Sequence, residues 1–506
     1  MRPQQHIAIR VDASNEIGTG HVMRCLTLAD GLSQQGAQVS FICRYLPDYL
    51  ADTLKEKGHR LHMLKHNFHT QTAGDLAHAH WLDASQQSDA TECIQLLGHQ
   101  QWDWLIVDHY ALDARWELAL RTIVKKIMVI DDLADRQHEC DVLLDQNFYN
   151  DQDHRYKFRV PSTCKLLLGP SYALLRQAFG ELHSQSKPRE GIVKRILVFF
   201  GGVDADNYTS RALNTLINLN LKNIDVDVVI GSLHAERSSI EAVCKAHGFS
   251  LHVQTIHMAK LMTAADFSIG AGGSATWERC CLGLPTLTAC TAVNQAQQLI
   301  DAAAEGLLFF PPGDESYEAL LSKHIPALIE NEYMRRTVSR NALHAVDGQG
   351  VSRITNMLRA NDIEMRVATA DDSSQLFEWR NHPSIRKVSR NTAAIPWEMH
   401  QAWFAEVLAS TSRVLLIGSL QAMTVGVVRF DFHDNQAEVS IYLVPDSQVR
   451  GLGRTLLLSA EQWIVRFHPE THSVYAHVLG ENEPSHRLFS RTNYQVESTC
   501  YIKRLH

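Results

Sequence analysis

The chain has 506 residues, of which 45% are hydrophobic and 21% are charged. This composition excludes disordered and fibrous proteins, and at roughly 150 residues per domain the length favours about three domains. The formal net charge of -8 argues against a general binder of nucleic acids. Ten cysteines at irregular spacing, without a CxxC pair, indicate a reducing compartment rather than a disulfide or zinc framework.

The N-terminal residues run almost at once into a strand-like stretch, which leaves no room for a signal peptide. No uninterrupted apolar run approaches the roughly 18 residues that a membrane helix needs. We therefore expect a cytoplasmic protein.

The first two thirds of the chain alternate short apolar runs with helical patterns, which predicts parallel sheets covered by helices. The expected strands of the first part are residues 7–11, 39–43, 104–107, 127–130 and 142–144, with helices at 21–34 and 111–124. The pattern restarts after a polar linker at 184–191, with strands at 196–200, 226–230, 251–253, 267–269 and 286–289. We predict two doubly wound, Rossmann-like α/β domains, at 1–183 and 192–345, with a ligand site between them.

A third pattern begins near residue 364 and differs from the first two. Strands are expected at 414–417, 424–430, 437–444 and 474–478, with helices between them, which predicts an α+β domain over 364–506. The charged helical stretch 333–361 is expected to pack on the second domain or to link onward.

A glycine-rich turn follows the first predicted strand. Gly18 and Gly20 permit a tight turn and a close backbone approach to a ligand, and His21 opens the helix behind them. An imidazole with a reference pKa of ~6.5 suits a general base near neutral pH. A plain strand-to-helix turn with a structural histidine is the alternative.

The second domain carries two further glycine turns, which favour a diphosphate ligand. Gly201-Gly202 follows one predicted strand, and Gly272-Gly273-Ser274 follows another, with Ser274 expected to cap a helix and contact an anion. Glu278 lies one turn later and could accept hydrogen bonds from ribose hydroxyls. Its alternative role is that of a solvated acid at a helix start.

Taken together, these motifs resemble a known family over residues 1 to about 345. The matching segments include Arg10-Val-Asp12-Ala-Ser14, Gly18 to Cys25, Val107-Asp108-His109-Tyr110, Ile130-Asp131-Asp132, Leu144-Asp145-Gln146-Asn147, Gly169 to Arg176 and Gly270 to Pro285. They resemble the PseG-type hydrolases of pseudaminic acid biosynthesis, relatives of the two-domain (GT-B) nucleotide-sugar glycosyltransferases.

The resemblance implies hydrolysis of UDP-2,4-diacetamido-2,4,6-trideoxy-β-L-altropyranose to UDP and the free sugar. It implies that His21 is the base and that Arg10, Asp12, Tyr110 and Asn294 lie at the substrate. A metal is not expected, and the paired Asp131-Asp132 is interpreted as structural or as a contact for sugar hydroxyls, since no further ligand spacing accompanies it. The histidine-rich region 59–80 is interpreted as a solvated face.

The third domain holds a loop whose backbone N–H groups could bind a pyrophosphate at the start of a helix. The loop and the polar positions downstream of it are Gln448, Arg450, Gly451, Gly453, Arg454, Asn482 and Ser485. Together they resemble the GNAT acyltransferases over residues 364–506, and Arg380-Asn381-His382-Pro383 is similar to the PseH-type N-acetyltransferases. The resemblance implies acetyl-CoA as co-substrate and an amino sugar as acceptor.

Two positions depart from the GNAT pattern. Phe489 stands where many members have the tyrosine that protonates the CoA thiolate, and Asn493 stands where they have glycine. Tyr494 and Tyr442 are the alternative acids, and Glu438 is the candidate base, with an exposed strand acid as its alternative interpretation.

The sequence thus predicts a bifunctional enzyme that acetylates a UDP-4-amino sugar and hydrolyses the product, with no nucleic acid or membrane partner. Three alternatives stay open: a GT-B glycosyltransferase, a hydrolysing 2-epimerase, and a third domain that senses acetyl-CoA without catalysis.

Overall fold

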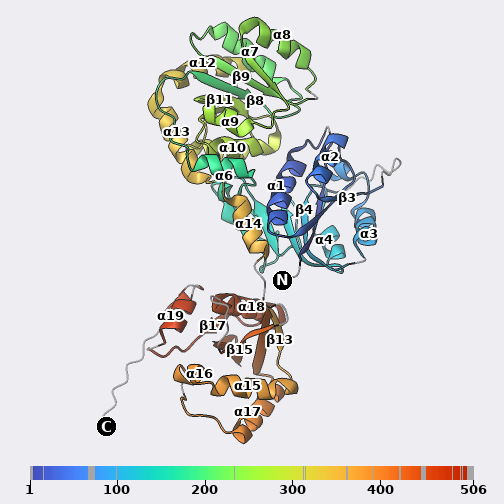
Figure 1. Cartoon of the computed structure of the whole chain (residues 1–506), viewed down its shortest axis with the longest axis vertical. Helices are drawn as coiled ribbons and strands as arrows, with labels where there is room; N and C mark the ends of the chain where they lie inside the picture. Colours follow the sequence, from blue (N-terminus) through green and yellow to red (C-terminus); the bar gives the residue numbers. More distant parts are fainter. Residues whose placement is uncertain are drawn as a thin grey trace. The chain divides into compact units, whose positions relative to one another are not determined.

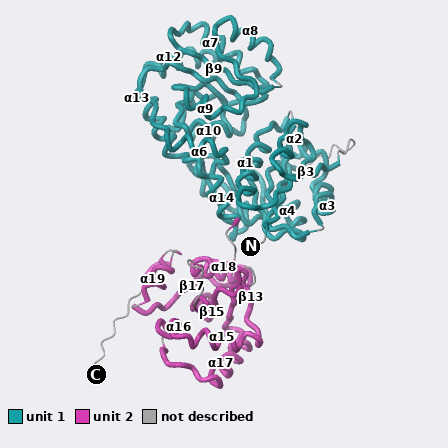
Figure 2. Tube along the Cα trace, in the orientation of Figure 1, with its two compact units in different colours: residues 1–358 teal, residues 359–506 magenta. Residues whose placement is uncertain are grey.

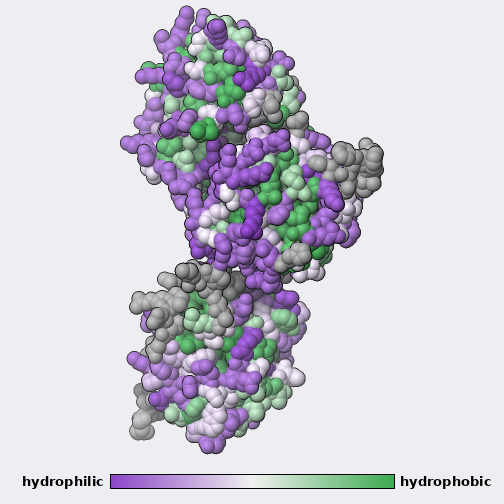
Figure 3. Space-filling view, turned by 45° about the vertical axis from the view of Figure 1, so that its right-hand side comes forward, coloured by the Kyte–Doolittle hydropathy of each residue, from purple (hydrophilic) through white to green (hydrophobic). Residues whose placement is uncertain are grey.

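The computed structural model describes residues 4–14, 16–65, 75–98, 100–232, 234–311, 313, 315–359, 363–389, 391–420, 423–445, 452–480, 482–490, 492 and 494–497. The chain divides into two compact units, a first unit of residues 1–358 and a second unit of residues 359–506 (Figure 2). The first unit holds two parallel sheets, which we call the N-lobe and the C-lobe, and the second unit holds a mixed sheet (Figure 1). The face shown in Figure 3 mixes hydrophilic and hydrophobic patches on both units.

The N-lobe sheet runs in the order β3 (Arg60–Met63), β2 (Gln38–Cys43), β1 (His6–Val11), β4 (Trp102–Asp108), β5 (Val124–Ile130), β6 (Val142–Asp145) and β7 (Lys165–Leu168). Its helices are α1 (Gly20–Gln34), α2 (Asp48–Glu56), η1 (Ala79–Leu82), α3 (Gln86–Leu97), α4 (Ala114–Leu120), α5 (Gln152–Arg155) and η2 (Pro170–Tyr172). The strands are apolar on both faces because one buried cluster lies on each side of the sheet.

The C-lobe sheet runs in the order β10 (Ser250–Val253), β9 (Asp225–Ile230), β8 (Arg195–Phe199), β11 (Phe267–Ala271) and β12 (Thr286–Ala289). Its helices are α6 (Gln177–His183), α7 (Tyr208–Leu219), α8 (Arg237–His247), α9 (Met258–Ala264), α10 (Ser274–Cys281), η3 (Val293–Gln295), α11 (Ala296–Ala304), α12 (Tyr317–Glu330) and α13 (Glu332–Ala345). In both lobes the strand order reverses beside the first strand, between β1 and β4 and between β8 and β11. Open α/β sheets bind ligands at such switch points.

The stretch that was expected to pack on the second domain or to link onward divides between the lobes. Helix α13 packs on α10 of the C-lobe. Helix α14 (Gly350–Arg359) instead buries Ile354 and Leu358 in the N-lobe core. The Trp104 indole N–H donates to the Leu358 carbonyl at 3.0 Å, and Gln35 donates to the Thr355 hydroxyl at 2.8 Å. The chain therefore returns to the N-lobe before the second unit begins.

The second unit has the sheet order β13 (Glu364–Val367), β14 (Arg413–Leu420), β15 (Met423–His433), β16 (Gln436–Leu443) and β17 (Ser473–Tyr475). Its helices are η4 (Ala370–Asp372), α15 (Ser373–Asn381), α16 (Pro383–Lys387), α17 (Trp397–Ala409), α18 (Leu452–Phe467) and α19 (Glu483–Ser490). One face packs on α18 and the other on α15 and α17. Strand β17 is parallel to β16, and their pairing ends at Glu438 and Tyr475.

Among the described helices, none is both long enough and apolar enough to span a bilayer.

Candidate active site

The N-lobe switch point brings the glycine turn beside the end of β4. Strands β1 and β4 are parallel neighbours with Val11 opposite Asp108, so the residues that follow both strands meet at one edge of the sheet. Gly18 has a φ of +77°, a left-handed conformation that favours glycine, and its N–H closes the turn onto the Ser14 carbonyl at 2.8 Å. The turn delivers His21 to the first turn of α1, next to Asp108.

Asp108 holds the predicted base in one orientation. His21 Nδ1 lies 2.6 Å from Asp108 Oδ1, and the carboxylate also accepts from Arg24 Nε at 2.6 Å and Nη2 at 2.7 Å. Burial alone would raise the pKa of Asp108, but the charges of Arg24 and His21 hold that pKa well below its usual range. Because an ionised carboxylate only accepts, His21 Nδ1 carries the proton of this hydrogen bond, which leaves Nε2 as the candidate proton acceptor.

A second carboxylate continues this network. Asp132 Oδ2 accepts from Arg24 Nη1 at 2.7 Å and from the Tyr110 hydroxyl at 2.8 Å. The other oxygen, Oδ1, is buried and has no hydrogen-bond partner in the described part of the chain. The Tyr110 ring stands edge-on to the His21 ring, with centroids 4.7 Å apart. Asp132 therefore offers an unused acceptor beside the base, a role that agrees with a sugar-hydroxyl contact.

Two aromatic residues that the sequence did not single out complete this site. Trp81 stacks on Tyr110 with centroids 5.5 Å apart, and His78 lies 5.4 Å from the same ring. The interpretation of residues 59–80 as a solvated face is thus wrong for His78, and also for His59, which is 4% exposed and bonded to Asp30.

Arg10 lies in β1 and Asp12 directly follows it, and both side chains bond to other residues of the N-lobe. Both side chains are fully buried, and Arg10 contacts Asp12 and Asp89 at 2.7 and 2.9 Å. Asp12 also accepts from His109 Nε2 at 3.1 Å and from the Arg44 N–H at 2.6 Å. Their assignment as substrate contacts stays a prediction, and these partners favour a supporting role beneath the site.

The Asp145-Gln146-Asn147 segment joins the lobes. The indole N–H of Trp277 in the C-lobe donates to Asn147 Oδ1 at 3.0 Å, and both groups are buried. Asp145 Oδ1 accepts from the Asn147 N–H, which fixes the turn. Burial and the nearby Asp132 raise the pKa of Asp145 to about 8, which favours its protonated form in the folded state.

The C-lobe switch point is built from backbone rather than from charged side chains. The N-cap of α10 is Gly273, with a φ of +83° and no side-chain cap, so the prediction that Ser274 caps this helix is wrong. Ser274 is the first helical residue and is exposed. Gly272 donates to the Ala289 carbonyl at 3.0 Å, which ties the turn to β12. This leaves the N–H groups at the start of α10 as candidate anion donors.

Glu278 lies within α10, one turn after Ser274. Its Oε1 accepts from Arg176 Nη2 at 3.2 Å, and its side chain is 19% exposed. Burial raises the pKa of Glu278, and Arg176 opposes that shift. The predicted sugar contact Asn294 lies in η3 after β12 and is exposed.

In the second unit, part of the predicted CoA site lies outside the described residues, namely Gln448, Arg450 and Gly451. Gly453, the second residue of α18, lies beside the side chains of Leu443 in β16 and Leu488 in α19, so these three elements meet there. Arg454 is exposed. Asn482 Oδ1 accepts from the Ser485 N–H at 3.3 Å and caps α19, which gives Asn482 a structural role in addition to the predicted one.

Glu438 and two tyrosines are the remaining predicted catalytic candidates of the second unit. Glu438 is half-buried on β16, in the last pair that joins β16 to β17. The Tyr494 hydroxyl donates to Glu461 Oε1 at 2.8 Å, and burial together with Glu461 raises its pKa. Tyr442 lies on the opposite face of the sheet, against the α15 and α17 layer. Phe489 is 8% exposed in the α18 core.

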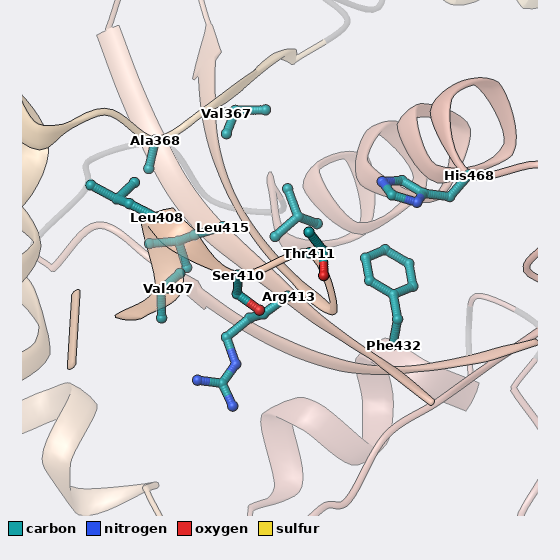
Figure 4. Close-up of a pocket in the computed structure, with 11 residues that line it drawn as sticks. Val367, Ala368, Val407, Leu408, Ser410, Thr411, Arg413, Leu415, Phe432 and His468 are labelled. Carbon is teal, nitrogen blue, oxygen red and sulfur yellow. The ribbon is translucent and has the colours of Figure 1, made fainter. Parts of the chain in front are cut away.

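The second unit also contains a cavity of about 350 Å³ (Figure 4). Its walls include Val407 and Leu408 of α17, Arg413 of β14, and Phe432 with His468. Arg413 pairs with Asp431 and Asp431 pairs with Glu438, whereas Gly426 pairs with Leu443 at the other end of the sheet. This cavity therefore lies at the end of the sheet away from the predicted CoA loop. In the described ranges, no cluster of three or more His, Cys, Asp or Glu side chains is placed to hold a metal ion.

Comparison with known proteins agrees with this division. The family model for the acetyltransferase (GNAT) domain matches residues 362–495. An uncharacterized protein of Methanocaldococcus jannaschii is 23% identical over 420 residues, which cover 79% of this chain and 77% of that protein. This share exceeds the first unit, so the similarity continues into the second.

Other similarities concern the first unit. The UDP-2,4-diacetamido-2,4,6-trideoxy-beta-L-altropyranose hydrolase of Campylobacter jejuni is 25% identical over 303 residues, or 59% of this chain and 97% of that enzyme. MurG of Acinetobacter baumannii superposes with a TM-score of 0.50 at 15% identity, over 71% of this chain and 99% of MurG, and shows the fold. These findings confirm the predicted fold class and both resemblances. The chain is thus an enzyme in which a homologue of the PseG-type hydrolases, with the two-lobed GT-B fold, precedes a C-terminal GNAT acetyltransferase domain.

Proposed function

We propose that this protein catalyses two consecutive reactions on one UDP-sugar. The second unit acetylates the 4-amino group with acetyl-CoA, and the first unit hydrolyses the resulting UDP-2,4-diacetamido-2,4,6-trideoxy-β-L-altropyranose. The observation that carries the proposal is the His21–Asp108 pair at the N-lobe switch point of a chain that also contains a GNAT domain.

In the hydrolysis, His21 Nε2 takes a proton from water while the water oxygen bonds to the anomeric carbon of the sugar. The bond between that carbon and the diphosphate oxygen breaks, and UDP leaves with the bonding electron pair. Asp108 keeps Nδ1 protonated and stabilises the imidazolium as it forms. Asp132 Oδ1 accepts a sugar hydroxyl, and Tyr110 and Asn294 lie at the sugar.

The C-lobe holds the UDP that leaves. The N–H groups of Gly273 and Ser274 at the start of α10 stabilise the diphosphate charge, while Gly272 holds the turn on β12, and Glu278 accepts from the ribose. Arg176 fixes one Glu278 oxygen and leaves the other for the ligand. Gly18 and Gly20 admit the substrate close to the backbone of the N-lobe.

In the acetyl transfer, Glu438 accepts the proton of the sugar amine as its nitrogen bonds to the acetyl carbon. The thioester carbon–sulfur bond breaks, and CoA leaves as the thiolate with the bonding electron pair and then takes a proton from water. Gln448, Arg450, Gly451, Gly453 and Arg454 hold the pyrophosphate of CoA, with Asn482 and Ser485 at the neighbouring α19.

A time course with the UDP-4-amino sugar, with and without acetyl-CoA and followed by NMR, tests the proposal. We expect the acetylated nucleotide sugar first and then UDP with free sugar, both only with acetyl-CoA. Rapid UDP release without acetyl-CoA would refute the order of steps. Release of UDP only with an added sugar acceptor would identify a glycosyltransferase instead, and an altered configuration at C2 would identify an epimerase.

A further inference from the structure

Three arginine side chains lie near one another on the side of the second unit's sheet that α15 and α17 cover. Arg380 ends α15, Arg386 lies in α16, and Arg429 lies on β15. Val427 and Tyr442 belong to the core on this face, and Arg429, two residues from Val427 on the same strand, points the same way.

These arginines have few partners. Arg380 Nη2 donates to the Asn391 carbonyl at 3.4 Å, and Arg386 Nη1 donates to the Thr392 carbonyl at 3.3 Å. Arg380 Nη1 and Arg386 Nε are buried and have no hydrogen-bond partner in the part of the chain that the structure describes. Such buried donors cost free energy unless a ligand or water satisfies them.

The guanidinium groups also act on each other. Burial lowers the pKa of Arg380, the charges of Arg429 and Arg386 lower it further, and Tyr442 opposes the shift. Arg429 and Arg413 share the single carboxylate of Asp431. Glu438 is on the same face, at the other end of this strand segment from Tyr442. An anion near Arg380 would therefore relieve both the repulsion and the unsatisfied donors.

The sheet lies between this cluster and α18, the helix that follows the predicted CoA loop. In the sheet, Tyr442 pairs with Val427 next to Leu443, so the cluster lies near the end of β16 that leads to the loop. Helix α18, which follows the loop, covers the opposite face. A ligand that reaches Arg380 and Arg386 thus approaches across the sheet from the helix that would bind the CoA pyrophosphate.

We infer that Arg380, Arg386 and Arg429 form an anion subsite that binds the diphosphate of the sugar nucleotide acceptor during acetyl transfer. The inference rests on the proposed function, since that function supplies an acceptor with a diphosphate. With the diphosphate on the arginines and the amine toward Glu438, one face of the sheet would hold the whole acceptor.

Acetyl transfer in the full chain tests this subsite. We expect Arg380→Ala and Arg386→Ala each to raise KM for the UDP-amino sugar about ten- to a hundredfold, the usual value of a charge-assisted contact. KM for acetyl-CoA should stay within about twofold. Arg380→Lys should restore part of the loss because it keeps the charge without the fork. Arg466→Ala, which removes an exposed guanidinium from α18, is the matched control. A raised KM for acetyl-CoA, with that of the acceptor unchanged, would assign the cluster to CoA and overturn the inference.

Hydrogen exchange with UDP as the probe separates this inference from the proposed function. Exchange is read peptide by peptide, so UDP bound in the first unit does not obscure residues 376–389. We expect UDP to slow exchange there in the wild type and not in the Arg380→Ala, Arg386→Ala double variant. Slowed exchange without any acetylation of the sugar would leave the subsite standing and reject the proposed reaction. Unchanged exchange in a protein that acetylates the sugar normally would reject the subsite.

Discussion

The N-lobe places charged side chains at its switch point, whereas the C-lobe places backbone turns at the corresponding position. His21, Asp108, Arg24 and Asp132 are bonded to one another within 2.8 Å at the end of β1 and β4. At the end of β11, the turn at Gly273 opens a helix without any side-chain cap, and Glu278 has Arg176 as its partner. The same strand order therefore supports two kinds of site.

This difference between the lobes agrees with the proposed tasks, since the N-lobe would supply the base and the C-lobe would bind the diphosphate. A base must be held in one tautomer and at one place, which requires a fixed hydrogen-bond partner on its other ring nitrogen. A diphosphate is bound well by N–H groups that need no side chain at all. The comparison predicts that changes in the N-lobe reduce the rate of the chemical step and that changes in the C-lobe reduce UDP affinity.

The largest expected effect is that of His21→Ala. Loss of the general base should lower kcat for hydrolysis about 1,000-fold. UDP affinity, measured by calorimetry, should change less than about twofold, since the ring acts on water and not on the nucleotide. Near-normal turnover would show that another residue is the base.

Asp108→Asn tests the orientation of the base. The amide keeps the shape but can present its NH₂ to Nδ1, which favours the wrong tautomer of His21, and it removes a charge from Arg24. We expect kcat to fall on the order of 100-fold, with KM within about threefold. A rise in KM with kcat unchanged would mean that Asp108 serves only to build the site. A melting curve of the variant checks that the buried Arg24 has not unfolded the lobe.

Removal of α14 tests the joint between the lobes. A fragment of residues 1–358 should fold and hydrolyse the diacetamido UDP-sugar without acetyl-CoA. A fragment of residues 1–349 lacks Ile354 and Leu358 in the N-lobe core and should lose at least about 3 kcal/mol of unfolding free energy. Denaturant unfolding of both fragments measures the difference. Equal stability would mean that α14 contributes little to the N-lobe.

Glu278→Ala should weaken UDP binding by about 1.5–3 kcal/mol, with a smaller effect on kcat. Calorimetry with UDP measures the loss. Because Arg176 would also lose its partner, Arg176→Ala is the control: if both variants weaken UDP equally, the effect lies in the ion pair and not in a ribose contact. Unchanged affinity in Glu278→Ala would exclude it from the site.

The smallest expected effect concerns pH. Asp145 is protonated in the folded state up to a pKa of about 8 and ionised above about 4 in the unfolded chain. The folded state thus binds the extra proton, and its stability falls as pH rises through this window. Asp145→Asn mimics the protonated acid, so relative to the wild type it should gain on the order of 1–3 kcal/mol between pH 5 and pH 8. Denaturant unfolding gives the unfolding free energy of both proteins at each pH. If the two free energies change with pH in parallel, Asp145 is not protonated in the folded state.

The sequence predicted the central strands well because they are long apolar runs between turns. Strands β3, β7 and β13 were not predicted, since these short strands have weak patterns that resemble loops. The return of α14 to the N-lobe could not be read from its amphipathic pattern, because a helix shows that it has an apolar face but not which core receives it.

The candidate site was predicted only in part, because its residues come from segments that are far apart in the sequence. The glycine turn and His21 stand out in one segment, whereas the partners of His21 come from β4 and from the end of β5, more than 80 residues away. Asp108 had one usable signal, a carboxylate directly after a buried strand. That signal becomes specific only when the sheet order puts β4 beside β1. Asp132 and Arg380 each stand in a motif that the sequence shows, but the unpartnered Asp132 Oδ1 and the grouping of Arg380 with other arginines depend on side-chain packing, which the motifs do not reveal.

The most direct test of the account uses the full-length His21→Ala variant with the UDP-4-amino sugar and acetyl-CoA. If the two units carry consecutive reactions and His21 serves the second, NMR should show the acetylated UDP-sugar accumulate to completion, with CoA released and without UDP. The unchanged amine, or UDP formed at the wild-type rate, would contradict the account.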